Sequence, residues 1–203
     1  MKSIHSKFCL PLFVTLALIV SCSDNDEPAV IEMEDDSQVA ITEVTLTFTP
    51  DGEGETVTAT WLNPGISSAP VMDDIELVEG VSYELSFIVI NTGPSTPEDF
   101  TAEILEEGIN YQFIFGYTDG IFADPAGFGN IDYMEGRINY RDTDEFGRPI
   151  GLTTIWTAGE ITANPRIFNV VLKYLPDTGK FNATNVNFGE ALIDITFNLS
   201  IVE

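Results

Sequence analysis

The chain has 203 residues, with 33 Asp and Glu against 8 Lys and Arg, and a formal net charge of −25 at pH 7. This charge excludes nucleic-acid binding through phosphates, which needs a positive surface. After residue 21 the sequence has no histidine and only one cysteine, Cys22. This excludes Ser-His-Asp and Cys-His catalysis, and it excludes ligation of zinc or iron–sulfur clusters by His or Cys. We therefore predict that the protein is not an enzyme.

Residues 1–21 have the three zones of a secretory signal peptide. Lys2 and Lys7 give a positive start, residues 8–20 form an apolar run, and the small Ser21 precedes Cys22. This order is typical of an export signal. The apolar run is shorter than the roughly 20 residues that a membrane-spanning helix needs. We therefore predict a signal peptide over residues 1–21.

The stretch "LIVSC" at residues 18–22 resembles the lipobox of bacterial lipoproteins. The resemblance implies that Cys22 receives a diacylglyceryl thioether and becomes the first residue of the mature chain. Several acyl chains hold a protein stably on a membrane, because each buried methylene contributes about 0.8 kcal/mol. The alternative is an ordinary signal peptide with an incidental cysteine.

Residues 22–40 form an acidic tether that begins "CSDNDEP". This start resembles the surface-export signal of Bacteroidota lipoproteins, which implies a place on the outer face of the outer membrane. A plain solvated linker is the alternative, since acid-rich segments with few apolar residues do not pack.

Strands are predicted from residue 41 onward, where the apolar period becomes two. Val44, Leu46 and Phe48 alternate with threonines, and residues 57–61 repeat this pattern after the turn sequence "PDGEGE". Alternation with turn residues between predicts a hairpin of half-buried strands. Further strands are predicted at residues 73–78 and 82–91.

Residues 96–108 are the one helical candidate. Thr96 is a potential N-cap, Pro97 suits the first helical position, and Gly108 suits the end of a helix. The pattern predicts one or two turns.

The second half of the chain returns to strands. Residues 110–120 predict a strand, and residues 136–159 predict a hairpin with its tip at 144–147. Residues 166–174 predict another strand, and the last strand alternates over inward-facing residues Ala191, Ile193, Ile195, Phe197, Leu199 and Ile201. Eight or nine strands with frequent turns predict an all-β, antiparallel, immunoglobulin-like β-sandwich over residues 41–203, with at most one short helix.

The tip of the second hairpin contains a partial calcium-loop pattern. Asp142, Asp144 and Gly147 have the spacing of such a loop, but Phe146 and Thr153 stand where oxygen ligands are expected. The alternative is a polar turn in which Asp caps the backbone and Gly takes a positive φ. "YTDGIFADP" offers Asp119 and Asp124 in a weaker acidic pattern. Adjacent pairs such as Glu106 and Glu107 cannot face each other across a cleft as glycosidase acids do.

Aromatic residues crowd residues 113–134, namely Phe115, Tyr117, Phe122, Phe128 and Tyr133. Mixed with Gly and Asp on a loop, they are candidates for a sugar-stacking or protein-binding platform. The alternative is that they fill the core of the sandwich.

Several segments together resemble a family of small envelope lipoproteins from Bacteroidota. They are "VTLTFTP", "VTATW", "EDFTAEILEEGINYQFIF", "YRDTDEFGRPIGLTTIWTAG" and "DITFNLSIV". The resemblance implies a lipoprotein of undefined function, sometimes linked with TonB-dependent uptake. Some members carry the label "type 1 periplasmic binding fold", whose two α/β lobes disagree with the length and period of this sequence.

We expect an outer-membrane, surface-exposed lipoprotein with a non-enzymatic binding or accessory role. Its expected partners are the membrane, through Cys22, and a TonB-dependent receptor or another outer-membrane protein, with no cofactor required. One alternative is a calcium-stabilised binding or adhesion module. Another is a lipoprotein that captures haem or siderophores, for which the ligands would be a tyrosine or Met33, Met72 or Met134.

Overall fold

The computed structural model describes residues 41–65, 68–92, 96–132, 137–176, 180 and 189–203. The predicted signal peptide, Cys22, the tether, Met33, Tyr133 and Met134 lie outside these residues.

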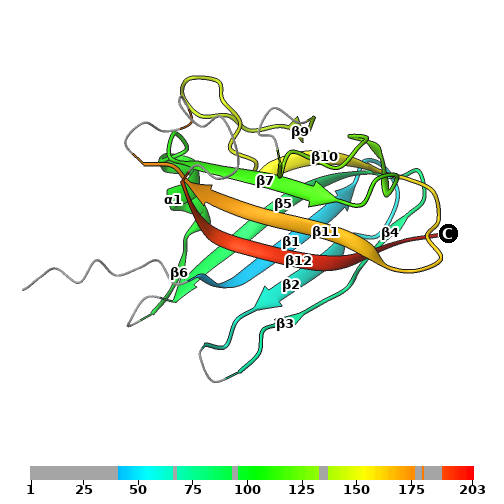
Figure 1. Ribbon diagram of the computed structural model, residues 1–203, viewed down its shortest axis with the longest axis horizontal. Helices are drawn as coiled ribbons and strands as arrows, with labels where there is room; N and C mark the ends of the chain where they lie inside the picture. Colours follow the sequence, from blue (N-terminus) through cyan, green and yellow to red (C-terminus); the bar gives the residue numbers. More distant parts are fainter. Residues whose placement is uncertain (1–40, 66–67, 93–95, 133–136, 177–179, 181–188) are drawn as a thin grey trace, which may run out of the picture. The chain divides into compact units, whose positions relative to one another are not determined.

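Two β-sheets lie face to face (Figure 1). The larger sheet has the order β3-β2-β1-β5-β10-β8, with β6 beside β5 and β9 beside β10. Its strands are β1 (Ile41–Pro50), β2 (Val57–Leu62), β3 (Val71–Met72), β5 (Ser82–Thr92), β6 (Pro97–Asp99), β8 (Phe122–Asp124), β9 (Asn139–Tyr140) and β10 (Thr153–Ala158). The smaller sheet has the order β4-β12-β11-β7, formed by β4 (Ile75–Val78), β7 (Tyr111–Tyr117), β11 (Arg166–Tyr174) and β12 (Glu190–Val202).

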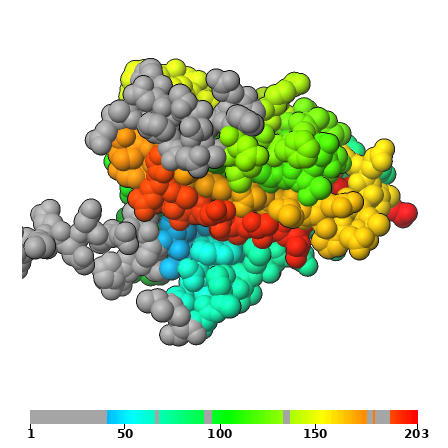
Figure 2. Space-filling view, in the orientation of Figure 1, coloured from blue at the N-terminus to red at the C-terminus, as the bar shows by residue number. Residues whose placement is uncertain are grey.

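The smaller sheet faces the viewer in Figure 1. In the space-filling view the side chains of β12 run as a band along this face, between those of the segment after residue 100 and those of β2 (Figure 2). The helix α1 (Thr101–Glu106) lies at one end of the sheets.

The predicted alternation sets which face of each strand is buried. In the β1–β2 hairpin, Val44 pairs with Trp61 and Leu46 with Ala59 on the inner face, while Thr45 pairs with Thr60 on the outer face. The hydroxyls of Thr45 and Thr60 lie 3.4 Å apart, which confirms that they share a face. β-branched threonines suit such an exposed, pleated surface.

Aromatic rings from both sheets meet in the core around Trp156 of β10, which is fully buried. Its ring centroid lies 5.2 Å from that of Phe115 and 5.3 Å from that of Phe168, both edge-to-face. Phe168 belongs to the smaller sheet, so these contacts join the two layers. Edge-to-face pairs add roughly 0.5–1.5 kcal/mol each beyond the burial of apolar area.

The prediction of an all-β sandwich with one short helix is confirmed. The described residues contain twelve strands, of which eight have four or more residues. All pairs are antiparallel except β4 with β12, which is parallel. The strand at 75–78 therefore does not pair with its neighbour in sequence, β5, but crosses to the smaller sheet.

The helix begins later than predicted. Thr96 does not cap it and Pro97 is not its first residue, because Pro97 pairs with Thr92 as part of β6. The helix starts at Thr101, whose N–H donates to the Asp99 carboxylate at 2.9 Å. The sheet pairing of β6 uses residues that would otherwise have formed the first turn.

The alternation of the last strand holds from Ile193 to Ile201, where every second residue is buried, namely Ile193, Ile195, Phe197, Leu199 and Ile201. It fails at Ala191, which is exposed. The register of β11 and β12 shifts between the Leu172–Ile193 and Lys173–Ala191 pairs. An extra residue at such a bulge moves the preceding side chain to the other face.

Candidate functional site

The hairpin between β9 and β10 is organised around Asp142 and Asp144, the two carboxylates for which the sequence left a partial calcium loop and a polar turn open. Asp142 accepts hydrogen bonds from three backbone N–H groups on the opposite arm, those of Gly151 at 3.0 Å, Leu152 at 2.9 Å and Thr153 at 3.3 Å. Both of its oxygens therefore hold the start of β10 against the hairpin.

Asp144 is the centre of a buried ion cluster. Its Oδ1 accepts from the N–H groups of Phe146 and Arg148, both at 2.9 Å. Its Oδ2 accepts from Arg148 Nε at 3.0 Å and lies 3.5 Å from Lys180 Nζ, which also donates to the carbonyl of Pro149. The Asp144 side chain is fully buried and that of Lys180 is 3% exposed.

Burial and neighbouring charges together shift the pKa values of Asp144 and Lys180. Burial alone would raise the pKa of Asp144, but the N–H groups of Arg148 and Phe146 and the charges of Lys180 and Arg148 lower it below its ordinary value. Burial lowers the pKa of Lys180 to about 8, although Asp144 opposes that change. Asp144 is thus held as a carboxylate by the chain's own donors.

These contacts support the turn interpretation of the hairpin tip. The N–H of Gly147 donates to the carbonyl of Asp144 at 2.9 Å, and Gly147 has a φ of +77°. The carboxylate oxygens that a calcium ion would use already accept from N–H groups and internal cations. In the described parts of the chain, no three His, Cys, Asp or Glu residues gather into a metal-binding group.

A buried polar network joins the hairpin to the edge of the smaller sheet. Asn130, which is fully buried, accepts from the N–H of Phe115 through Oδ1 and donates through Nδ2 to the Tyr140 hydroxyl, each at 2.8 Å. Tyr140 in turn donates to the carbonyl of Phe113 at 2.6 Å. Burial raises the pKa of Tyr140, so its hydroxyl stays protonated and can donate. The network fixes β9 beside β7.

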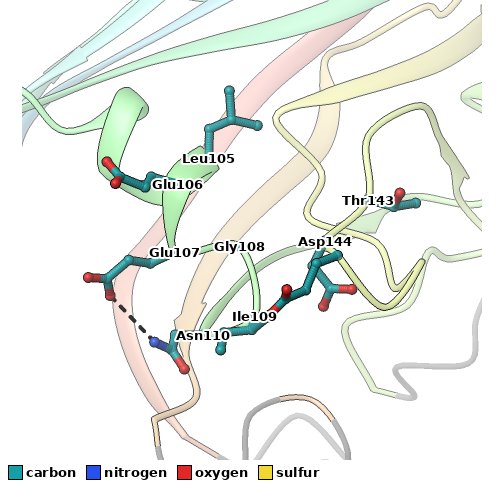
Figure 3. Close-up of a pocket in the computed structure, with 9 residues that line it drawn as sticks. Leu105, Glu106, Glu107, Gly108, Ile109, Asn110, Thr143 and Asp144 are labelled. Atoms are coloured by element: carbon teal, nitrogen blue, oxygen red, sulfur yellow. Dashed lines mark hydrogen bonds between the residues drawn. The ribbon is translucent and has the colours of Figure 1, made fainter.

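Two clefts flank this hairpin. The first, which we call the helix cleft, has a volume of about 480 Å³ between the end of α1 and the hairpin tip. It is lined by Leu105, Glu106, Glu107, Gly108, Ile109, Asn110, Thr143, Asp144 and Glu145. Figure 3 shows Glu106 and Glu107 pointing away from Asp144, with Glu107 accepting a hydrogen bond from Asn110. Glu106 and Glu107 therefore form no facing pair with Asp144.

The second, which we call the strand cleft, has a volume of about 580 Å³. It is lined by Asp124, Ile138, Asn139, Tyr140, Arg141, Thr143, Pro149 and Ile155. Here polar groups converge, because Asn139 Nδ2 donates to Asp124 Oδ2 at 2.8 Å. The lining combines a carboxylate, an amide and a guanidinium with an apolar strip, which is the mixture found in small-molecule sites.

The five candidate aromatics do not form one platform. Phe115, Tyr117 and Phe122 are at most 5% exposed and belong to the core, so the core-filling alternative holds for them. Phe128 is 66% exposed, and Tyr133 lies outside the described residues. Only Phe128 of the four described rings could stack on a ligand.

Among the residues that the structure describes, the candidate haem ligands are not brought together either. Met72 is 39% exposed on β3, at the edge of the larger sheet, and it lines neither cleft. Tyr83, Tyr111 and Tyr117 are buried in the core.

Sequence reasoning missed Lys180, Arg148 and Asn130, and it did not connect Asp124 with Asn139. Lys180 meets Asp144 across 36 residues of sequence, and no local pattern marks such a partner. Only the position of Asp124 in an acidic stretch gave any signal.

No protein-family model, no curated protein and no solved structure matches this chain. Within the described residues, no helix has the length and apolar character needed to cross a membrane.

Proposed function

We propose that this chain is an outer-membrane, surface-exposed lipoprotein, anchored through acylated Cys22, whose β-sandwich binds a ligand, a glycan or a receptor without catalysing a reaction. The observation that supports this proposal is the lack of side chains for nucleophilic catalysis in the part of the sequence after the predicted signal peptide. After residue 21 the sequence has no imidazole, and its one thiol stands in the lipobox-like stretch.

The carboxylates near the clefts also lack the arrangement of an acid–base pair. Those of Asp142 and Asp144 accept from backbone and internal cations, and those of Glu106 and Glu107 point away from the hairpin. The strand cleft, in contrast, presents converging donors and acceptors without a nucleophile and its base. This favours binding over bond cleavage.

The anchor is tested by mass spectrometry of the full-length chain purified from membranes of a bacterial host, with Cys22→Ser as the matched control. We expect the mature chain to begin at Cys22 and to carry acyl mass, and Cys22→Ser to lose that mass and partition into the soluble fraction. An unmodified mature amino terminus would contradict the proposal.

The partner and the exposed position are tested on intact cells. Protease treatment should remove the domain from the cell surface, and cross-linking before solubilisation should co-purify an outer-membrane barrel of the TonB-dependent kind. The calcium alternative would instead be supported by a rise in Tm on adding calcium that Asp142→Ala abolishes.

A further inference from the structure

The strand cleft lies on the outer face of the larger sheet, at the edge formed by β8 and β9. Both short strands pair with β10, Asp124 with Thr157 and Asn139 with Ile155. Because side chains alternate along strands, and Trp156 faces the core, Asn139 and Ile155 point to the outer face. The topology thus brings together two segments that are 15 residues apart in sequence.

Arg141 completes the polar side of the cleft. Its N–H donates to the carbonyl of Thr153 at 2.9 Å, which continues the pairing of β9 with β10 and places Arg141 two residues beyond Asn139. The Arg141 side chain is exposed, and within the described part of the chain its guanidinium makes no ion pair. It is one of only six basic residues after residue 21.

We infer that the strand cleft binds a neutral carbohydrate, with Asp124, Asn139 and Arg141 as its hydrogen-bonding groups, an inference that rests on the proposed non-enzymatic binding function. A carboxylate only accepts hydrogen bonds and a guanidinium only donates them. The two N–H bonds of the Asn139 amide already go to Asp124 Oδ2 at 2.8 Å and to the Ile155 carbonyl at 3.4 Å, so Asn139 offers its Oδ1 as an acceptor. Adjacent sugar hydroxyls both donate and accept, so they satisfy all three groups without adding charge.

The apolar part of the lining fits the same ligand class. Ile155 and Pro149 are half-buried and line the cleft beside the polar groups. They offer a surface for the C–H face of a sugar ring. The volume of about 580 Å³ lies within the range of small-molecule sites.

The charge of the surroundings selects against anionic ligands. The chain carries a formal net charge of −25, which disfavours anionic sugars. The cleft lining holds one carboxylate, Asp124, and one guanidinium, Arg141, so it has no uncompensated charge of its own to attract a cation. A zwitterion such as an amino acid would also pair with Asp124 and Arg141. Both groups are exposed, however, and an exposed ion pair contributes only about 0–1 kcal/mol.

The outer face of β5 and β10, next to the cleft, carries hydroxyl groups that a longer ligand could contact. Along β10, Thr153 pairs with Ser86 and Thr157 with Ser82 on the outer face. The Ser82 and Thr157 hydroxyls lie 2.7 Å apart. Hydroxyl groups on this surface match those of an oligosaccharide, so we expect a short oligosaccharide to bind more tightly than its monosaccharide.

The test uses the full-length chain in detergent micelles on an array of neutral, acidic and amino-sugar oligosaccharides, with free amino acids and dipeptides measured in parallel by calorimetry. We expect at least one neutral oligosaccharide to bind. Asp124→Asn and Arg141→Gln should each weaken it roughly tenfold, the effect of losing one charged hydrogen bond. The matched controls Asp119→Asn and Arg166→Gln, at exposed positions outside the lining, should leave binding unchanged.

Circular dichroism and Tm of each variant show that it is folded, which separates a lost contact from a lost fold. Three results would overturn the inference: no neutral oligosaccharide bound by the wild type, binding unchanged in folded Asp124→Asn or Arg141→Gln, or binding of amino acids or dipeptides alone. None of them bears on the anchor, which the acyl mass on Cys22 reports separately.

Discussion

Replacing Asp144 with Asn tests the buried ion cluster, because Asn keeps the shape of the side chain and removes its charge. The variant removes the carboxylate charge that faces the guanidinium of Arg148 and the ammonium of Lys180. The Lys180 side chain is 3% exposed and that of Arg148 is 19% exposed. Removing one partner of a buried ion pair costs about 3–5 kcal/mol. Since Arg148 can reach water, we expect the lower end, about 3 kcal/mol.

This loss should lower Tm by about 6–12 °C, because a domain of 150–250 residues shifts by roughly 2–4 °C per kcal/mol. The assays are thermal unfolding for Tm and urea unfolding for the free energy of unfolding, both followed by tryptophan fluorescence, which reports on buried Trp156. Glu145→Gln is the control, since Glu145 is the next residue and is exposed. Its free energy of unfolding should stay within about 0.5 kcal/mol of wild type.

A double-mutant cycle sharpens the test. Lys180→Met removes the ammonium, so adding it to Asp144→Asn should restore part of the lost stability. The two changes should therefore differ from additivity by about 1 kcal/mol or more. A loss below 1 kcal/mol for Asp144→Asn, or strict additivity with Lys180→Met, would refute the idea that these groups stabilise the hairpin together.

Three further predictions concern the core, a backbone contact and pH. Phe122→Ala should lower the free energy of unfolding by about 3–5 kcal/mol because it leaves a cavity in the core. Phe128→Ala should change it by under about 0.5 kcal/mol, and equal losses for the two variants would contradict the placement of Phe122 in the core. Gly129→Ala should lower the free energy of unfolding, measured in urea, by about 2–4 kcal/mol more than Gly127→Ala. Both glycines have a positive φ, but only at Gly129 would an added Cβ collide with the carbonyl oxygen of Phe115. Burial lowers the pKa of Lys180 to about 8, against 10.5 in the unfolded chain, so the unfolded chain binds more protons between these two values. Stability should therefore rise with pH from about 8 to 10 in wild type and less so in Lys180→Met, and identical pH profiles would show that folding does not lower the pKa of Lys180.

The sequence predicted the layers of the fold because burial follows a simple period. Residues 193–201 alternate in the structure as they do in the sequence pattern. At two residues, Pro97 and Ala191, the structure departs from the pattern because a local feature of the strands changes the outcome. Pro97 was available to a helix or to an edge strand, and pairing with β5 decided for the strand. The side chain of Ala191 lies on the exposed face because of a bulge in the pairing of β11 with β12, which the alternation of the sequence does not predict.

The candidate site was harder to predict because it depends on contacts between distant segments. The pattern at Asp142 and Asp144 was visible, yet the donors that occupy their oxygens include a lysine 36 residues away. For Phe115 and Phe122 the composition left a loop platform and the core both open, and the structure places them in the core. The strand cleft exists only because β8 and β9 follow each other along β10.

The hydrogen bonds around Asn130 also affect whether β7, at the edge of the smaller sheet, can pair with a strand of another molecule. β7 is the last strand of that sheet, and every one of its residues is buried. Its backbone groups bond to Phe128, Asn130 and Ile150. A neighbouring molecule therefore finds no free strand to extend here, and growth of a cross-β ribbon from this side requires that segment to detach first. This edge of the smaller sheet is thus protected from pairing between molecules by contacts made within one molecule.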